Sequence, residues 1–154
     1  MPETLLRSTP DAPWLPAGGR ADVVRSDAAP SPTGLVRLLV RRGREVLCVP
    51  RDDGRLDLPT RVVPPDDPDG RRTAGELARD VLEGVPRPAP VGFVRNVVTA
   101  PAPGYPWPVP LAHFSVWSAA GAPVRAGRWL DVNDEALRER HWWPLAAALQ
   151  EQGG

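Results

Sequence analysis

The pattern of apolar and polar positions separates a polar N-terminal stretch from a strongly patterned remainder. Residues 1–33 are rich in Pro, Ala, Asp and Gly, and only the run 21–24 has the apolar, β-branched character of a strand. We expect this stretch to be an extended, partly ordered arm, either anchored by Trp14 and Leu15 or disordered in part. Residues 34–154 are then expected to form one domain.

Several apolar runs in the remainder indicate strands. Residues 35–40 and 45–49 flank the polar Arg42-Gly43-Arg44, and this arrangement predicts a hairpin. The turn-forming Asp52-Asp53-Gly54 precedes a short strand that Pro59 stops. Pro-rich residues 64–70 are expected to be a loop. Further strands are expected at 91–99, 111–117 and 128–130.

The stretch from Thr73 to about Glu83 has helical periodicity. Thr73 and Glu76 have capping-box spacing at its start, and Gly84 followed by Pro86 marks its end. The apolar residues that recur on one face of this helix are Ala74, Leu77, Ala78 and Val81.

Two more helices are predicted near the C-terminus. Asn133-Asp134-Glu135 supplies a polar cap and an acidic first turn for one of them. Pro144 opens the other, which covers 145–150. The order of strands, one helix, strands and then helices is typical of a mixed β-sheet flanked by helices, an α/β (α+β mixed) fold.

The composition limits the function. The chain has 154 residues, 42% of them hydrophobic, which suits one soluble globular domain. Its 19 basic residues, all Arg, balance 19 acidic ones, so nothing favours a nucleic-acid binder with a concentrated basic surface. The single cysteine, Cys48, lies in an apolar run and is expected to be a buried hydrophobe in a reducing compartment. No run resembles a leader peptide or a membrane span, so we expect a cytoplasmic protein without a membrane partner.

The polar face of the helix predicted at 73–83 carries the candidate chemistry. At about 100° per residue, Glu76, Arg79, Asp80 and Glu83 fall together, opposite the apolar stripe. Carboxylates at this spacing repel one another unless a cation lies among them. The face can hold a divalent cation with a diphosphate, because Mg²⁺ shares its oxygen ligands with substrate phosphates. The alternative is a solvated charged face that Arg79 stabilises.

The order of these elements resembles that of Nudix hydrolases. Their signature is G-x5-E-x7-R-E-U-x-E-E-x-G-U, in which U is aliphatic, and Arg79-Asp80-Val81-Leu82-Glu83 is similar to its R-E-U-x-E part. The resemblance spans roughly residues 34–149, from the hairpin and Leu58-Pro59 to the segment Trp129-Leu130-Asp131. It implies a Nudix-like α/β/α sandwich with a mixed β-sheet.

The resemblance also implies roles for the helix residues. Glu83 and Arg79 are the catalytic candidates, with Arg79 in the position of the signature arginine. Asp80 and Glu83 take the positions of metal-binding carboxylates, and Glu76 can supply a third from one turn earlier. Mg²⁺ or Mn²⁺ is the implied cofactor.

The rest of the signature differs in this chain. Pro65, Arg71 and Gly84 stand where the signature has Gly, Glu and Glu. An alternative register places Gly84-Val85 on the closing G-U, but it loses the arginine and acid positions. Two functions therefore compete. One is metal-dependent hydrolysis of an acid anhydride in a nucleoside-diphosphate-linked substrate, and the other is a catalytically impaired Nudix-like module that binds a ligand or partner. A third reading is an unrelated α/β domain.

Four residues outside this helix are candidates for substrate binding. Tyr105 and Trp107 lie in a Pro-stiffened loop, where aromatic faces can stack on a nucleobase or pack on the protein itself. Arg95 can meet a phosphate or be an exposed strand residue. His113 alternates with Phe114 along a strand, so it faces the opposite side, as a general base, a phosphate ligand or a structural histidine. The expected partners are a small-molecule, nucleotide-type substrate and, by default, a second copy in a homodimer.

Overall fold

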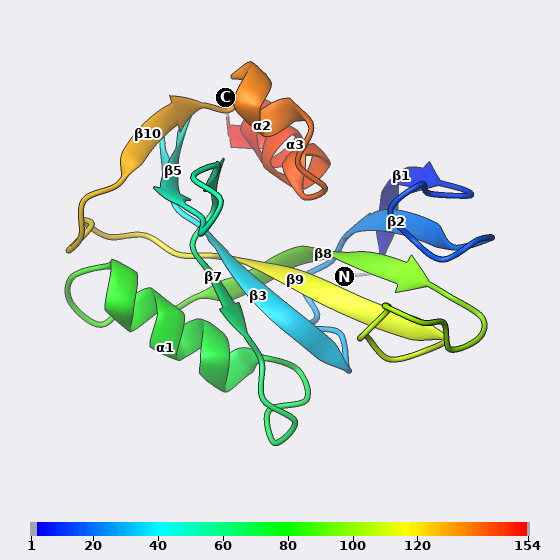
Figure 1. The fold of residues 1–154 in the computed structure, drawn as a ribbon. Coiled ribbons are helices and arrows are strands. Elements are labelled where there is room, and N and C mark those ends of the chain that lie inside the picture. The colour runs from blue at the N-terminus through cyan, green and yellow to red at the C-terminus, as the bar shows by residue number, and fades with distance from the viewer. Residues whose placement is uncertain (1–2, 154) are drawn as a thin grey trace.

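The computed structural model describes residues 3–153 as a mixed α/β fold (Figure 1). The strands are β1 (Thr4–Thr9), β2 (Arg20–Arg25), β3 (Thr33–Leu39), β4 (Arg41–Arg42), β5 (Glu45–Pro50), β6 (Leu56–Asp57), β7 (Thr60–Val62), β8 (Ala89–Val97), β9 (Leu111–Ser118) and β10 (Arg128–Asp131). The helices are α1 (Arg71–Val81), α2 (Glu135–Arg138) and α3 (Trp143–Gly153). The mixed fold predicted from the order of elements is confirmed.

Two sheets organise the chain. The larger has six strands in the order β1-β2-β8-β9-β3-β7, and among the strands that the structure describes its one parallel pair is β3 with β9. The smaller has the order β10-β5-β4, with β6 paired to β5. Helix α1 lies on one side of the larger sheet, and α2 and α3 lie on the other (Figure 1).

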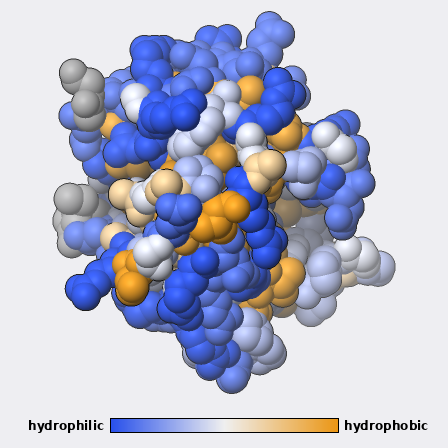
Figure 2. All heavy atoms as spheres, turned by 90° about the vertical axis from the view of Figure 1, so that its left-hand side faces the viewer, coloured by the Kyte–Doolittle hydropathy of each residue, from blue (hydrophilic) through white to orange (hydrophobic). Residues whose placement is uncertain are grey.

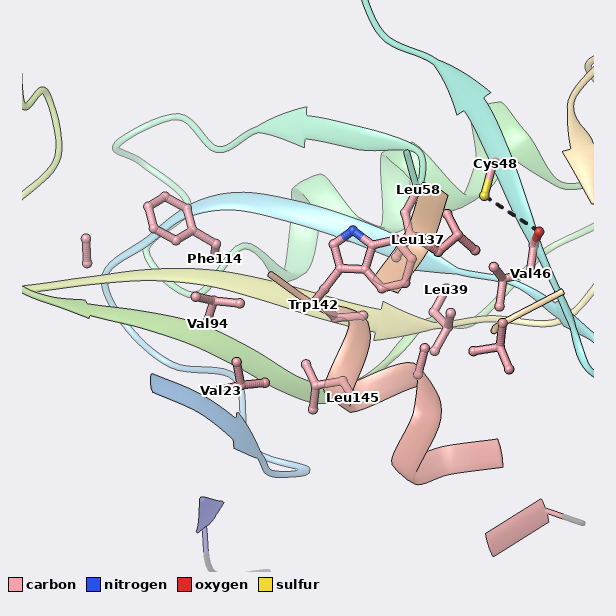
Figure 3. Packing of buried hydrophobic residues seen from close by; sticks show 14 residues of the cluster. Val23, Leu39, Val46, Cys48, Leu58, Val94, Phe114, Leu137, Trp142 and Leu145 are labelled. Carbon is pink, nitrogen blue, oxygen red and sulfur yellow. Dashed lines mark hydrogen bonds between the residues drawn. The ribbon is translucent and has the colours of Figure 1, made fainter. Parts of the chain in front are cut away.

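The two faces of the larger sheet carry separate hydrophobic clusters. On one face, residues of the sheet pack against α3 and the segment before it; they include Val23, Val94, Phe114, Trp142 and Leu145. Figure 3 shows Trp142 in the middle of this cluster. On the opposite face, residues of β3 pack against α1; they include Val36, Leu38, Leu77 and Ala78. A side chain on one face of this sheet is therefore separated from the other face by the sheet itself.

The N-terminal segment differs from the extended arm that we expected. It contributes β1 and β2, and β2 pairs with β8 inside the larger sheet. Buried Asp22 of β2 joins the two strands, because its carboxylate accepts a hydrogen bond from Ser8 Oγ of β1 at 2.6 Å. Within β2, the same carboxylate accepts from Arg20 Nε at 3.1 Å. β1 is an edge strand with mostly exposed positions, so it lacks the hydrophobic alternation by which a strand is found in sequence.

The first turn of α1 is capped differently from the prediction. Gly70 occupies the N-cap position with a φ of 74°. Asp67, from the preceding loop, accepts hydrogen bonds from the Thr73 backbone N at 2.8 Å and from the Thr73 hydroxyl at 2.7 Å. Thr73 was expected to be the cap, with Glu76 reaching back to it. Instead Thr73 is a buried donor to the capping carboxylate.

The C-terminal end of α1 also differs. The helix ends at Val81, and Leu82 is extended and forms an isolated bridge with Pro123. Glu83, which was expected on the last turn, lies beyond the helix and donates its backbone N–H to the Ala122 carbonyl at 2.8 Å. This contact comes from a segment 39 residues further along the chain, so the local pattern of the helix could not reveal it.

The predicted hairpin is present in altered form. The strands on either side of its turn are β4 and β5, which pair with each other. β3, which was expected to pair with β5, pairs instead with β7 and β9 in the larger sheet. β7 itself follows Pro59 directly, where no strand was expected.

The remaining predictions concern burial and the C-terminal helices. Cys48 is buried, as expected, and burial raises the pKa of its thiol to about 12. Asp134 caps α2 by accepting the Ala136 backbone N–H at 2.9 Å, as predicted. In the part of the chain that the structure describes, no helix has the length and apolar character needed to cross a bilayer. Figure 2 shows that hydrophilic side chains cover most of the molecular face seen there.

Candidate functional site

Arg61 of β7 lies against the acidic face of α1. Its guanidinium pairs with Asp80 and, at 4.0 Å, with Glu76, whose other oxygen is 3.9 Å from Arg72 Nε. The hydrogen bond from Arg61 lowers the pKa of the Asp80 carboxyl. A side chain of the protein thus takes the place that a metal ion was expected to occupy between these carboxylates.

The other helix candidates do not complete a ligand set. Arg79 is exposed on α1, and Glu83 lies beyond the end of the helix. Among residues 3–153, no three His, Cys, Asp or Glu side chains come together in a way that could hold a metal ion. The residues of α1 therefore do not fit a divalent cation in this arrangement, and metal binding stays a prediction.

Arg95 and His113 pair with each other on adjacent strands. Arg95 Nε donates to His113 Nε2 at 3.1 Å, and the other ring nitrogen of His113 lies 3.0 Å from the Pro32 carbonyl. Burial lowers the pKa of His113. As predicted, His113 faces the side opposite to Phe114, and this geometry favours the structural alternative for His113. The Arg95 guanidinium also pairs with Glu3 at 2.9 Å, so its side chain is held by the protein itself.

A cavity of about 700 Å³ opens on the face of the sheet that bears Phe114. Its floor is formed by residues of β3, β8 and β9, and its walls by the turn between β5 and β6 and by α2 with the segment after it. Trp14 and Trp107 complete the lining. None of the α1 residues described above lines it. The main cavity and the predicted metal-binding face are thus on opposite sides of the larger sheet.

One part of the cavity is strongly cationic. Four arginines line it, against two carboxylates; the arginines are Arg37, Arg51, Arg55 and Arg140. Buried Asp57 lies among them and is already engaged. One of its oxygens accepts Trp142 Nε1 at 2.7 Å and the Leu58 N–H at 2.8 Å, and the other is 3.5 Å from Arg51 and 4.0 Å from Arg140. The lining therefore carries an excess of two positive charges.

Arg37 is the arginine on the floor of the cavity. Its Nε is buried and has no hydrogen-bond partner in the described chain. Burial lowers the pKa of its guanidinium, and Asp57 opposes that shift. Because a guanidinium stays charged in proteins, Arg37 places a cation on the floor of the cavity, and Asp57 offsets part of that charge.

Aromatic side chains also line the cavity. Trp107 meets Phe114 edge to face, with ring centroids 5.0 Å apart, and Trp14 meets His141 in the same way at 4.5 Å. Burial and the nearby Arg37 and Arg140 lower the pKa of His141. Of the two aromatic residues predicted to bind substrate, Trp107 lies in this cavity, whereas Tyr105 lines a smaller hollow beside Trp14.

Sequence reasoning missed most of the cationic lining. Two signals were present. Arg37 interrupts the apolar run 35–40, and Arg51 and Arg55 flank the turn at 52–54. Neither signal says which face a side chain takes, and Arg140 meets this cluster only through the packing of α2 against β6.

Comparisons with known proteins bear on the fold. No protein-family model matches the chain, and no curated protein matches it by sequence. The structure is similar to the crystal structure of a pyrophosphohydrolase mutant from Bacillus subtilis, BsRppH, with a TM-score of 0.60 and 11% sequence identity, over 96% of this chain and 98% of that chain. The solution structure of the Escherichia coli ORF135 protein aligns with a TM-score of 0.47 and 16% identity, over 80% of this chain and 93% of that chain. The chain thus has a Nudix-like mixed α/β fold, similar to that of the B. subtilis pyrophosphohydrolase.

Proposed function

We propose that this protein is a Nudix-like domain that binds a phosphorylated aromatic small molecule, of the nucleotide class, in the arginine-lined cavity. The observation that carries this proposal is the cavity itself. It combines four arginines with an engaged Asp57 at one part and the aromatic side chains of Trp107 and Phe114 at another. Binding of this kind needs no divalent cation at α1.

The arginines identify the charged part of the ligand. A guanidinium offers donors in a planar fork that fits phosphate oxygens, and hydrogen bonds between charged groups are the stronger ones. The buried Nε of Arg37 and the side chain of Arg51, about half exposed, offer such donors from the floor and the wall of the cavity. A phosphate with two negative charges would neutralise the excess charge of the lining.

The aromatic residues identify the uncharged part. Trp107 and Phe114 already form an edge-to-face pair at 5.0 Å, and a planar heterocycle can join such a pair by stacking. Stacking of a base on an aromatic side chain contributes about 1–3 kcal/mol. The cavity volume of about 700 Å³ lies within the range of roughly 300–1,000 Å³ that is usual for small-molecule sites.

Hydrolysis of a nucleoside-diphosphate-linked substrate is a second candidate, and the similarity to a pyrophosphohydrolase favours it. In that case Mg²⁺ or Mn²⁺ would bind to Asp80, Glu83 and Glu76. Arg61 would first have to leave Asp80 and Glu76, and Glu83 would have to approach them. Fold similarity alone does not establish an activity, so the proposal rests on the cavity.

Calorimetric titration with ADP in EDTA tests the binding proposal. We expect wild-type protein to bind ADP, and Arg51→Gln to bind it about tenfold to 100-fold more weakly, since a hydrogen bond to a charged group contributes roughly 1.5–3 kcal/mol. Arg51 is suited to this test because its side chain is about half exposed. Arg87→Gln is the matched control, because Arg87 is exposed and does not line the cavity.

The outcomes separate the two candidates. Absence of ADP binding, or equal weakening by Arg51→Gln and Arg87→Gln, contradicts the proposed site. Release of phosphate that requires Mg²⁺ or Mn²⁺ and is lost in Glu83→Gln supports the hydrolase.

A further inference from the structure

Asn96 of β8 is a polar residue in the floor of the cavity for which the fold gives no structural role. It is 6% exposed and lines the cavity. In the register of the sheet it lies between Ala21 of β2 and Ala112 of β9. The methyl side chains of these two neighbours offer no hydrogen-bond partner to its amide.

The side-chain amide of Asn96 makes no hydrogen bond to any other residue in the described part of the chain, although its backbone is paired on both sides. Buried polar groups nearly always have a partner, because an unmet donor or acceptor costs free energy. The Asn96 amide is not sealed from solvent, since its atoms are not among the fully buried unpaired ones. Its donor and acceptor are thus available from the cavity.

The position of Asn96 relative to the cations follows from the strand register. Asn96 of β8 is paired with Ala112 of β9. Arg37 of β3, the strand on the other side of β9, is paired with Val116, which is four residues further along β9. With about 3.3 Å per residue and about 4.8 Å between strands, the two backbone positions are roughly 16 Å apart. The floor therefore presents an amide and a cation that are separated by the apolar side chains of Val94, Phe114 and Leu35.

We propose that Asn96 is the specificity-determining residue of this cavity and reads the edge of a heterocycle that presents a donor next to an acceptor, as adenine does. This inference rests on the proposed function, since it assigns the aromatic part of that ligand. An amide can accept from the adenine N6 amino group and donate to N7. Guanine presents two acceptors, O6 and N7, on the corresponding edge, and one of them would oppose the amide oxygen.

The experiment compares three ligands, ADP, GDP and ribose 5-phosphate, by calorimetry in EDTA. We expect wild-type protein to bind ADP about tenfold or more tightly than GDP, within the range of discrimination known for a bidentate amide–adenine pair. Asn96→Ala should bind ADP and GDP with equal affinity and should leave the affinity for ribose 5-phosphate unchanged. Asn96→Asp, which replaces the donor by a second acceptor, should weaken ADP binding further.

The possible results separate this inference from the function on which it rests. Equal affinity of wild-type protein for ADP and GDP, or a preference that persists in Asn96→Ala, overturns the role of Asn96 and leaves the cavity proposal standing. If none of the three ligands binds to wild-type protein, both proposals fail. Thermal unfolding of Asn96→Ala serves as the folding control, and we expect no loss of stability because the amide has no protein partner.

Discussion

Arg37 places a charge in the middle of a strand whose other residues are apolar. Val36, Leu38 and Leu39 are fully buried beside it, and its own Nε lies buried without a partner in the described chain. A cation in such surroundings destabilises the fold unless it is paired. If Arg37 binds a ligand phosphate, the same buried charge that lowers the stability of the free protein strengthens binding of the ligand.

Replacement of Arg37 should therefore separate stability from binding. We expect Arg37→Met, which keeps the length of the chain and removes the charge, to raise the free energy of unfolding by about 1–2 kcal/mol and to weaken ADP binding. Urea unfolding with and without ADP measures both effects. Arg87→Met is the control, with an expected change within about 0.5 kcal/mol at an exposed position. A clear destabilisation by Arg37→Met would show that the guanidinium has a structural partner.

At the level of single residues, the sequence predicted side-chain alternation better than it predicted the site. His113 and Phe114 face opposite sides of the sheet, as their alternation requires. Which of the two sides holds the cavity depends on the packing of α2 and of the β5–β6 turn, and no local pattern contains that information. Trp107 lies in the cavity, whereas Arg95 does not. For either residue, contact with a substrate stays a prediction.

Among the elements, α1 shows how a helix prediction that places the apolar stripe correctly can still mislead about a site. Its apolar stripe is confirmed, with Ala74, Leu77 and Ala78 buried. The carboxylates on its other face are held by Arg61, which belongs to a strand that was not predicted. The spacing of charged residues along the helix predicted that they would gather on one face. It could not predict which cation would compensate them, because β7 meets α1 only in the folded protein.

The start of α1 gives a second quantitative prediction. Asp67 accepts hydrogen bonds from the Thr73 backbone N–H, the Thr73 hydroxyl and, at 3.3 Å, the Arg72 N–H. Loss of an N-terminal cap costs about 0.5–2 kcal/mol, and Asp67→Ala also leaves the buried Thr73 hydroxyl without its acceptor. We expect Asp67→Ala to lower the free energy of unfolding by about 2 kcal/mol in chemical denaturation.

The neighbouring Asp66 is the control for this prediction. Its carboxylate pairs with Arg72 on the surface at 2.7 Å and is largely exposed. Exposed ion pairs contribute little, so Asp66→Ala should be close to wild type. Equal effects of the two substitutions would contradict the capping role of Asp67.

For the molecule as a whole, the larger sheet divides the candidate residues between its two faces. The sequence indicated a mixed sheet flanked by helices, and that architecture is confirmed. It gave the α1 carboxylates as candidate metal ligands, and Arg95, His113 and two residues of the aromatic loop as separate candidates for substrate binding. In the fold, Trp107 lines the cavity on the α3 side, whereas α1, Arg95 and His113 belong to the opposite side. The order of strands in the sheet decides which residues lie on the same face and close together. This order is not local in sequence: β2 and β8 are neighbours, although about 70 residues separate them.

A crystal structure of the protein with ADP in the absence of divalent cations would test the proposed cavity site most directly. We expect electron density for the phosphates beside Arg37 and Arg51, and for the base beside Trp107 and Asn96, on the α3 side of the sheet. Phosphate density at α1, beside Arg61 or Glu83, would contradict it.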